Sequence, residues 1–158
     1  MALELITDRT QTDYDHANYL NTRDVREMTP KEVTELLSGE LKGSYDYTDR
    51  NRVEVAVNYL VGLLNVNGYH IDISVIKTNW TENDVFRYPD MERYLNNIKA
   101  IKHAFYGTVG LPENMRSIDY EVANQIERLL LEIEMHINRL YLSAWVCGEA
   151  MCGEGTTL

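Results

Sequence analysis

The stretch Tyr47-Thr48-Asp49-Arg50-Asn51-Arg52-Val53-Glu54 decides the fold, because its pattern recurs further along the chain. Residues 120–127 repeat its Tyr, Asn, apolar and Glu positions at the same offsets, and residues 88–94 repeat the frame with Tyr, Glu, Arg and Tyr. A fainter copy lies at residues 12–17. Such recurrence is typical of repeated helical units, and the uneven spacing favours related helix starts over a regular solenoid. The alternative is that ordinary helix starts share a few capping residues.

Apolar stripes with helical spacing follow each of the three strong copies. They predict long amphipathic helices that begin near residues 47, 89 and 119, the last ending near residue 143, with Thr48 and Asp119 as N-caps. Two shorter helices are predicted at 12–26 and 30–37, the second with a capping box at Thr29-Pro30-Lys31-Glu32. The fold class is therefore mainly α. We expect the long helices to form a bundle through the equivalent positions Val53/Tyr94/Ile126, Val57/Ile98/Leu130 and Leu60/Ile101/Ile133.

Two further segments depart from the helical pattern. Residues 70–76 alternate apolar and polar side chains, which predicts one short, half-buried strand. Residues 144–158 lack basic residues and carry several glycines, so we expect an extended C-terminal arm after a helical domain of residues 1–143. The apolar or aromatic side chains near this junction are interface candidates, and they are Trp145, Met151, Tyr141 and His136.

The composition excludes several classes of partner. With 25 acidic and 15 basic residues the net charge is −10, which works against binding to nucleic acid or to an anionic membrane. No stretch approaches the roughly 20 apolar residues of a membrane span, and the start lacks the features of a signal peptide. Only Cys147 and Cys152 could form a disulfide, which favours a reducing environment. Eleven tyrosines suit contact surfaces as well as a core.

No residue set predicts catalysis, a metal or a cofactor. Cys147, Cys152 and His136 lack a second ligand pair for structural zinc, and the other histidines stand in no known catalytic motif. A glycosidase needs only two carboxylates, but those near helix starts are better explained as caps, and they are Asp46, Asp49, Asp84 and Asp90. Arg52 and Arg93 share one frame position and could either pair with acidic residues of an adjacent repeat or remain solvated.

Several segments resemble phage and prophage structural proteins of Gram-positive bacteria that are encoded among tail and baseplate genes. They are residues 5–11, 47–53, 77–81, 91–95 and 123–127 and the C-terminal tail. Similar proteins often carry Ser-Gly-Glu where this chain has Cys147-Gly148-Glu149 and Cys152-Gly153-Glu154, which indicates that the cysteines are not essential ligands. The resemblance implies a virion component and brings no active site.

We therefore expect a non-enzymatic virion protein, made in the host cytoplasm, that acts as an assembly or adaptor subunit of a tail or baseplate. Its expected partners are copies of itself, with a trimer favoured, and other virion proteins. The alternative is a module that binds a host-surface glycan through exposed aromatic rings. A small hydrolase of cell-wall polymer is a third, weaker possibility. A glycan site should combine exposed aromatics with convergent amides, whereas an adaptor should leave apolar stripes uncovered.

Overall fold

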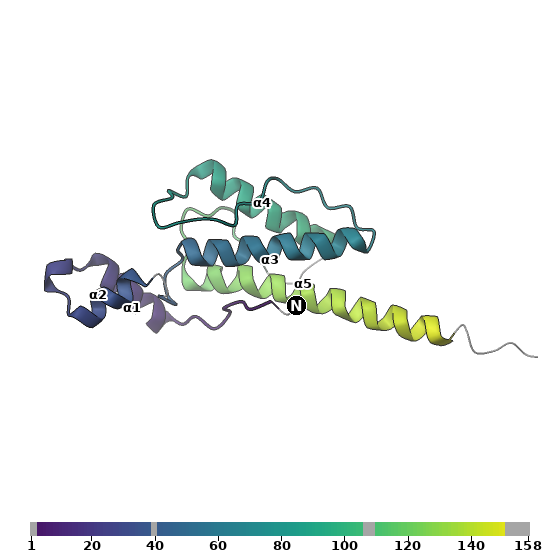
Figure 1. Cartoon of the computed structure of the whole chain (residues 1–158), viewed down its shortest axis with the longest axis horizontal. Coiled ribbons are helices and arrows are strands. Elements are labelled where there is room, and N and C mark those ends of the chain that lie inside the picture. The colour runs from purple at the N-terminus through teal and green to yellow at the C-terminus, as the bar shows by residue number, and fades with distance from the viewer. Residues whose placement is uncertain (1–2, 39–40, 106–109, 151–158) are drawn as a thin grey trace, which may run out of the picture.

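A computed structural model describes residues 3–38, 41–105 and 110–150, and this part of the chain is mainly helical (Figure 1). It contains five α-helices, which are α1 (Gln11–Thr22), α2 (Pro30–Leu37), α3 (Tyr47–Val66), α4 (Tyr88–Phe105) and α5 (Tyr120–Ala150). One 3-10 turn, η1 (Val25–Glu27), lies between α1 and α2.

The long helices α3, α4 and α5 form the bundle that the sequence predicts. Each of the three contacts both others. All nine side chains at the equivalent stripe positions are buried, with exposed fractions of 2 % or less. Apolar side chains from the connecting segments close the rim of this core, among them Ile71, Ile73, Ile76 and Phe86. The amphipathic stripes therefore meet one another, and their burial supplies the main stabilising term of the fold.

The pair α1 and α2 lies beside one end of the bundle (Figure 1). Its own small core consists of Ala17, Leu20 and Leu41, with Leu36 packed against them. The predicted first helix is longer than the observed one, because α1 ends at Thr22 and Arg23 has an extended backbone. The capping box of α2 is confirmed, since Thr29 accepts from the Glu32 N–H and the Glu32 carboxylate accepts from the Thr29 N–H.

The repeated tyrosines mark helix starts, as the pattern predicts. Tyr47, Tyr88 and Tyr120 are the first residues of α3, α4 and α5. Asp119 caps α5, because its carboxylate accepts the Val122 N–H at 2.8 Å. The prediction of Thr48 as a cap is wrong, since Asp46 is the N-cap of α3 and Thr48 lies inside its first turn. Asp46 is the cap because its carboxylate accepts hydrogen bonds from both the N–H and the hydroxyl of Thr48, each at 2.7 Å.

The prediction of a strand at residues 70–76 is wrong. No strand occurs in the described residues, and the chain after α3 runs extended without a neighbouring strand. Side chains take the place of a partner strand here. Asn65 accepts the Ile71 N–H at 3.1 Å, and Asn97 accepts the Ser74 N–H at 2.8 Å and donates to the Ser74 carbonyl at 3.3 Å. Ile71 and Ile73 are partly buried because the segment lies along the helices, but the alternation ends at Val75, which is 81 % exposed.

The predicted end of the last helix at residue 143 is also wrong. Helix α5 continues to Ala150 and passes through Gly148, so residues 144–150 are helical and not part of an extended arm. A helical glycine costs only about 1 kcal/mol relative to alanine, which a helix that is already nucleated can tolerate. Residues 151–158 lie outside the described part. Because its helical conformation continues to Ala150, α5 projects well beyond α3 and α4 (Figure 1).

We expect Ile98→Ala and Ile133→Ala each to lower the free energy of unfolding by about 2–5 kcal/mol, because both side chains are fully buried in the bundle. Urea denaturation of the purified variants measures this. Leu37→Ala serves as the control, since Leu37 is exposed and its truncation should change stability by less than about 0.5 kcal/mol. Losses as small as the control's at both isoleucines would contradict the assigned core.

Candidate functional site

The first distinctive site is a row of side chains on α5 that binds the backbone of the N-terminal segment, residues 3–9. The Leu3, Ile6 and Arg9 N–H groups donate to Glu134 (3.3 Å), Glu127 (2.6 Å) and Asn124 (3.1 Å). Asn124 also donates to the Arg9 carbonyl at 2.8 Å. The bonds recur every third residue, and the segment runs antiparallel to α5.

A matching site on α3 binds residues 77–80. Asn51 accepts the Trp80 N–H at 2.7 Å and donates to the Trp80 carbonyl at 2.8 Å. Glu54 accepts the Lys77 N–H at 3.0 Å. Each helix thus uses Asn-x-x-Glu on one face to hold an extended backbone, and we call each such pair with its bound segment a clamp.

The two bound segments are related in sequence, a repeat that our sequence analysis missed. Thr7-Asp8-Arg9-Thr10 corresponds to Thr78-Asn79-Trp80-Thr81, and an Asp follows three residues later in both cases. Both Asp side chains accept from the N–H and hydroxyl of the preceding Thr, Asp13 at 2.8 Å for both bonds and Asp84 at 2.8 and 2.9 Å. The repeat could have been recognised in the sequence from the shared spacing Thr-(Asp/Asn)-x-Thr-x-x-Asp.

The carboxylate of Glu127 joins three segments of the chain at one buried point. It accepts four N–H groups, from the Ile6 backbone at 2.6 Å, from Arg9 at 2.6 Å and from the Nη2 and Nε atoms of Arg52 at 3.0 and 3.1 Å. Asp49 pairs with both arginines, and its distance to Arg9 is 2.7 Å. Two arginines therefore balance two carboxylates, which is what a buried ionic cluster requires.

Glu54 makes the equivalent arrangement in the second clamp. Arg93 of α4 binds it through both terminal nitrogens, at 3.0 and 2.5 Å, and the Trp80 indole N–H lies 3.3 Å away. Trp80 thus occupies the place that Arg9 has in the first clamp. Arg93 also donates to the Val75 carbonyl at 2.7 Å, which fixes the segment ahead of the clamp.

The pKa shifts agree with a structural use of these charges. Burial opposes the charge of Arg52, but hydrogen bonding and attraction from Glu127 and Asp49 outweigh it and raise the pKa of the guanidinium. Burial raises the pKa of the Asp49 carboxyl, although Arg9 and Arg52 act in the opposite direction. Nearby, burial raises the pKa of the Tyr94 hydroxyl, which hydrogen-bonds to Tyr45. The Glu127 and Glu54 carboxylates accept hydrogen bonds on both oxygens.

Several predicted roles can now be assigned. Arg52 and Arg93 do pair with acidic residues of a neighbouring repeat, namely Glu127 and Glu54. Asp46 is a helix cap, and Asp49 completes its capping box by accepting from the Asp46 N–H. Lys77 and the Thr81 backbone and hydroxyl lower the pKa of Asp84 to about 2. These carboxylates stabilise turns and helix starts, as the sequence analysis favoured.

The interface candidates all fall on or after α5. Tyr141 and His136 are exposed, and their role in an interface stays a prediction. Trp145 is on the helix, but its side chain lies outside the described part, as does the whole of Met151. The structure therefore places Tyr141 and His136 in accessible positions on α5.

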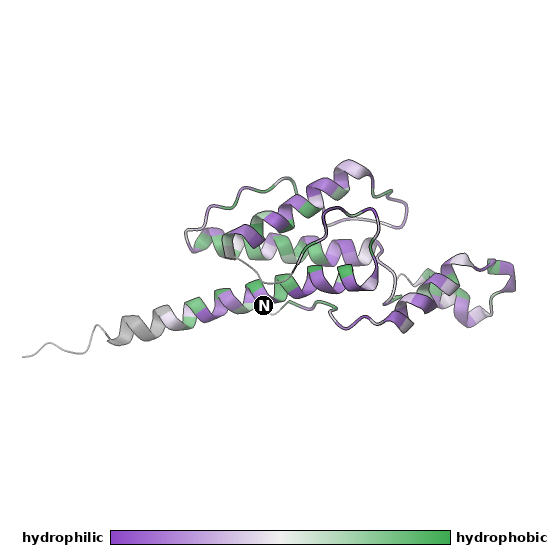
Figure 2. Cartoon of the chain, turned by 180° about the vertical axis from the view of Figure 1, so that it is seen from behind, coloured by the Kyte–Doolittle hydropathy of each residue, from purple (hydrophilic) through white to green (hydrophobic). Residues whose placement is uncertain are grey.

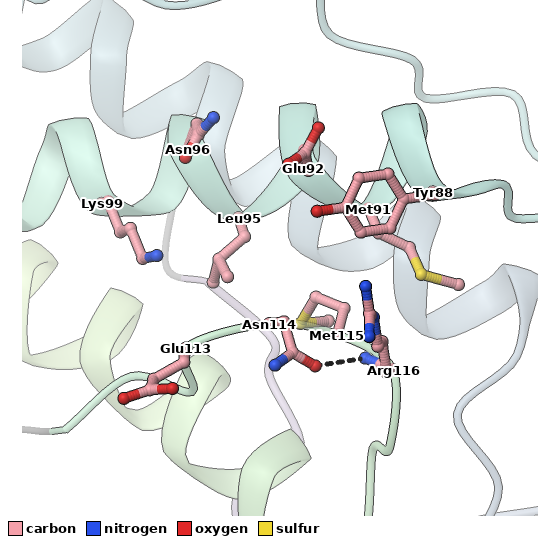
Figure 3. A pocket seen from close by; sticks show the side chains of 10 residues that line it. All are labelled: Tyr88, Met91, Glu92, Leu95, Asn96, Lys99, Glu113, Asn114, Met115 and Arg116. Carbon is pink, nitrogen blue, oxygen red and sulfur yellow. Dashed lines mark hydrogen bonds between the residues drawn. The ribbon is translucent and has the colours of Figure 1, made fainter.

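A surface groove of about 150 Å³ lies between α4 and the segment 113–116 (Figure 3). Tyr88 and Arg116 face each other at one end, with Lys99 and Glu113 at the other. The Arg116 guanidinium covers the Tyr88 ring at 5.4 Å from its centre. The amides of Asn96 and Asn114 line the groove, but its only aromatic ring is already stacked. This geometry lacks the paired, open aromatic rings expected of a glycan site.

A larger, mainly apolar hollow of about 390 Å³ lies between the N-terminal segment and α3, lined by Leu3, Leu5, Val55 and Ala56 among others. Among the described residues, no group of three His, Cys, Asp or Glu side chains could hold a metal ion. None of the described helices is both long and apolar enough to span a bilayer.

No protein-family model matches the chain, and neither a curated protein nor a solved structure matches it significantly.

We expect Asn124→Ala to accelerate hydrogen exchange of the Arg9 amide, and Asn51→Ala to accelerate that of the Trp80 amide, because each loses its acceptor. Each variant should also lose about 1–3 kcal/mol of stability. Hydrogen exchange followed by NMR measures both amides, and each variant controls for the other because the second clamp stays intact. Asn58→Ala, at an exposed position of α3, should alter neither amide. Unchanged exchange of the Arg9 amide in Asn124→Ala and of the Trp80 amide in Asn51→Ala would contradict the two assigned hydrogen bonds.

Proposed function

We propose that this chain is a non-enzymatic structural protein of a phage particle, an assembly or adaptor subunit of the tail or baseplate that associates with copies of itself and with other virion proteins. It is made in the host cytoplasm and ends in the virion. The location in a phage particle is supported by the resemblance of residues 5–11, 47–53, 77–81 and 91–95 to tail and baseplate proteins. The role as an adaptor subunit is supported by the geometry of the helices.

The observation that carries the adaptor role is the projecting part of α5. Leu140, Tyr141 and Leu142 lie there with exposed fractions of 48, 47 and 68 %. Consecutive exposed apolar residues on a helix that has left its bundle are typical of a surface that another chain covers. An adaptor needs such a surface, joined to a body that keeps its shape.

The two clamps support the rigid body. They tie extended segments to α3 and α5 through buried carboxylates whose hydrogen-bonding capacity is filled. Hydrogen bonds on both oxygens of each carboxylate restrict the movement of the bound segments, while the buried Nε of Arg9 is left without a hydrogen-bond partner among the described residues. A site for hydrolysis would instead need a carboxylate pair open to substrate in a cleft.

Host-surface glycan binding is the less favoured function on the geometry of the described residues. Exposed tyrosines are dispersed, with Tyr19 on α1, Tyr69 after α3 and Tyr88 at the start of α4. Tyr19 and Tyr88 each carry an arginine over the ring, at 5.3 and 5.4 Å. At these two tyrosines a sugar would have to displace the arginine before it could stack on the ring.

The test is mass spectrometry of purified phage particles, combined with electron microscopy of particles from a strain that lacks the gene. We expect the chain in wild-type particles at a fixed ratio to a known tail protein, and defective tails or baseplates without it. An abundant host cytosolic enzyme is the control for carry-over. Absence of the chain from clean particles would refute the proposal. Intact particles that merely fail to adsorb would favour the glycan-binding alternative.

A further inference from the structure

The apolar seam of α5 continues after the bundle ends. Ile126, Leu130, Ile133 and Ile137 follow one another at helical spacing and are buried to 3 % exposure or less. Leu140 is the next residue of this series, and it is half-exposed. The change occurs because α5 has 31 residues, whereas α3 has 20 and α4 has 18. In the part of the chain that the structure describes, the shorter helices leave the end of the seam uncovered.

The projecting part is apolar on more than one side. Leu140, Tyr141 and Leu142 are consecutive, and at about 100° per residue they span about 200° of the helix circumference. Met135, one heptad before Leu142, is also exposed and extends the second side toward the bundle. Figure 2 shows apolar residues along this part of α5, beyond the end of the bundle. A single neighbouring helix would cover only one of the two sides.

The stretch of α5 just beyond the bundle carries no charged side chains. Residues 140–148 contain no Asp, Glu, Lys or Arg, although these make up 25 % of the chain. Copies with a net charge of −10 repel one another, and this repulsion opposes close contact least at a stretch without charge. When copies run in parallel around a common axis, residues of the same number lie at one level, so a charge at the contact would be repeated in every strand.

We propose that the projecting part of α5 is the contact surface between copies of this chain, and that three copies associate there as a parallel three-stranded coiled coil. A two-fold dimer uses one self-complementary patch, whereas a closed ring uses two different patches on each copy. The two apolar sides, one with Leu140 and one with Leu142 and Met135, supply such a pair. Three is the smallest ring, and its helices must run in parallel. The inference rests on the proposed function and names the self-contact of that subunit.

The test is sedimentation equilibrium of the purified full-length chain at tens of micromolar, with Leu140→Gln, Leu142→Gln and the matched control Arg139→Gln. We expect three times the chain mass of 18.3 kDa for the wild type and for the control. Each leucine variant should weaken association about tenfold or more, because it removes a buried apolar side chain from the contact. Circular dichroism should show unchanged helix content, since neither leucine is part of the bundle core.

A monomeric or dimeric wild-type chain overturns the inference, and so does a leucine variant that associates as tightly as Arg139→Gln. Strand direction is tested with Leu140→Cys in a chain whose own Cys147 and Cys152 are changed to Ser. Parallel strands bring the new cysteines within disulfide reach, whereas failure to cross-link under mild oxidation contradicts the parallel arrangement. A monomer that is nevertheless found in purified particles would overturn this inference and the self-association in the proposed function, and would leave the proposed role as a virion subunit intact.

Discussion

The fold depends on a carboxylate that the chain buries and fully satisfies. Glu127 is inaccessible to solvent and accepts from Ile6, Arg9 and Arg52, so one side chain ties the N-terminal segment and α3 to α5. Apolar packing alone would leave the angular position of the helices loosely specified. We infer that the buried carboxylate favours the one arrangement that brings its donors together, at the cost of desolvating both carboxylates and both arginines.

The second clamp repeats this solution, and the two are reciprocal along the chain. The segment 3–9, which precedes α3, is held by α5, while the segment 77–80, which precedes α5, is held by α3. Each half of the chain therefore completes the other, and we infer that the halves fold as one unit. Such interlocking suits the proposed adaptor, because a force applied to the end of α5 would be carried into the whole body through Glu127 and Asn124.

Sequence periodicity predicted the part of the structure that depends on local pattern. The stripes through Val57, Ile98 and Leu130 gave the bundle, and Asp119 was recognisable as a cap because its partner lies three residues away. The clamps were not predictable in this way. Asn51 and Glu54 stood out as a repeated pattern, but their partners lie more than twenty residues away and are backbone groups without a side-chain signature. The same cause explains the strand predicted at residues 70–76, since the alternation of apolar and polar side chains does not reveal which group accepts a backbone N–H.

The most direct test of this account is the free energy of unfolding of Glu127→Gln. Glutamine keeps the shape but removes the charge, which leaves the buried Arg9 and the partly buried Arg52 with Asp49 as their remaining anionic partner. The account predicts a loss of about 3–5 kcal/mol, as for a buried ion pair that loses one member. Glu121→Gln, on the exposed side of the same helix, should change the free energy by less than about 0.5 kcal/mol. A loss at Glu127 no larger than that of the control would contradict the central position of this carboxylate.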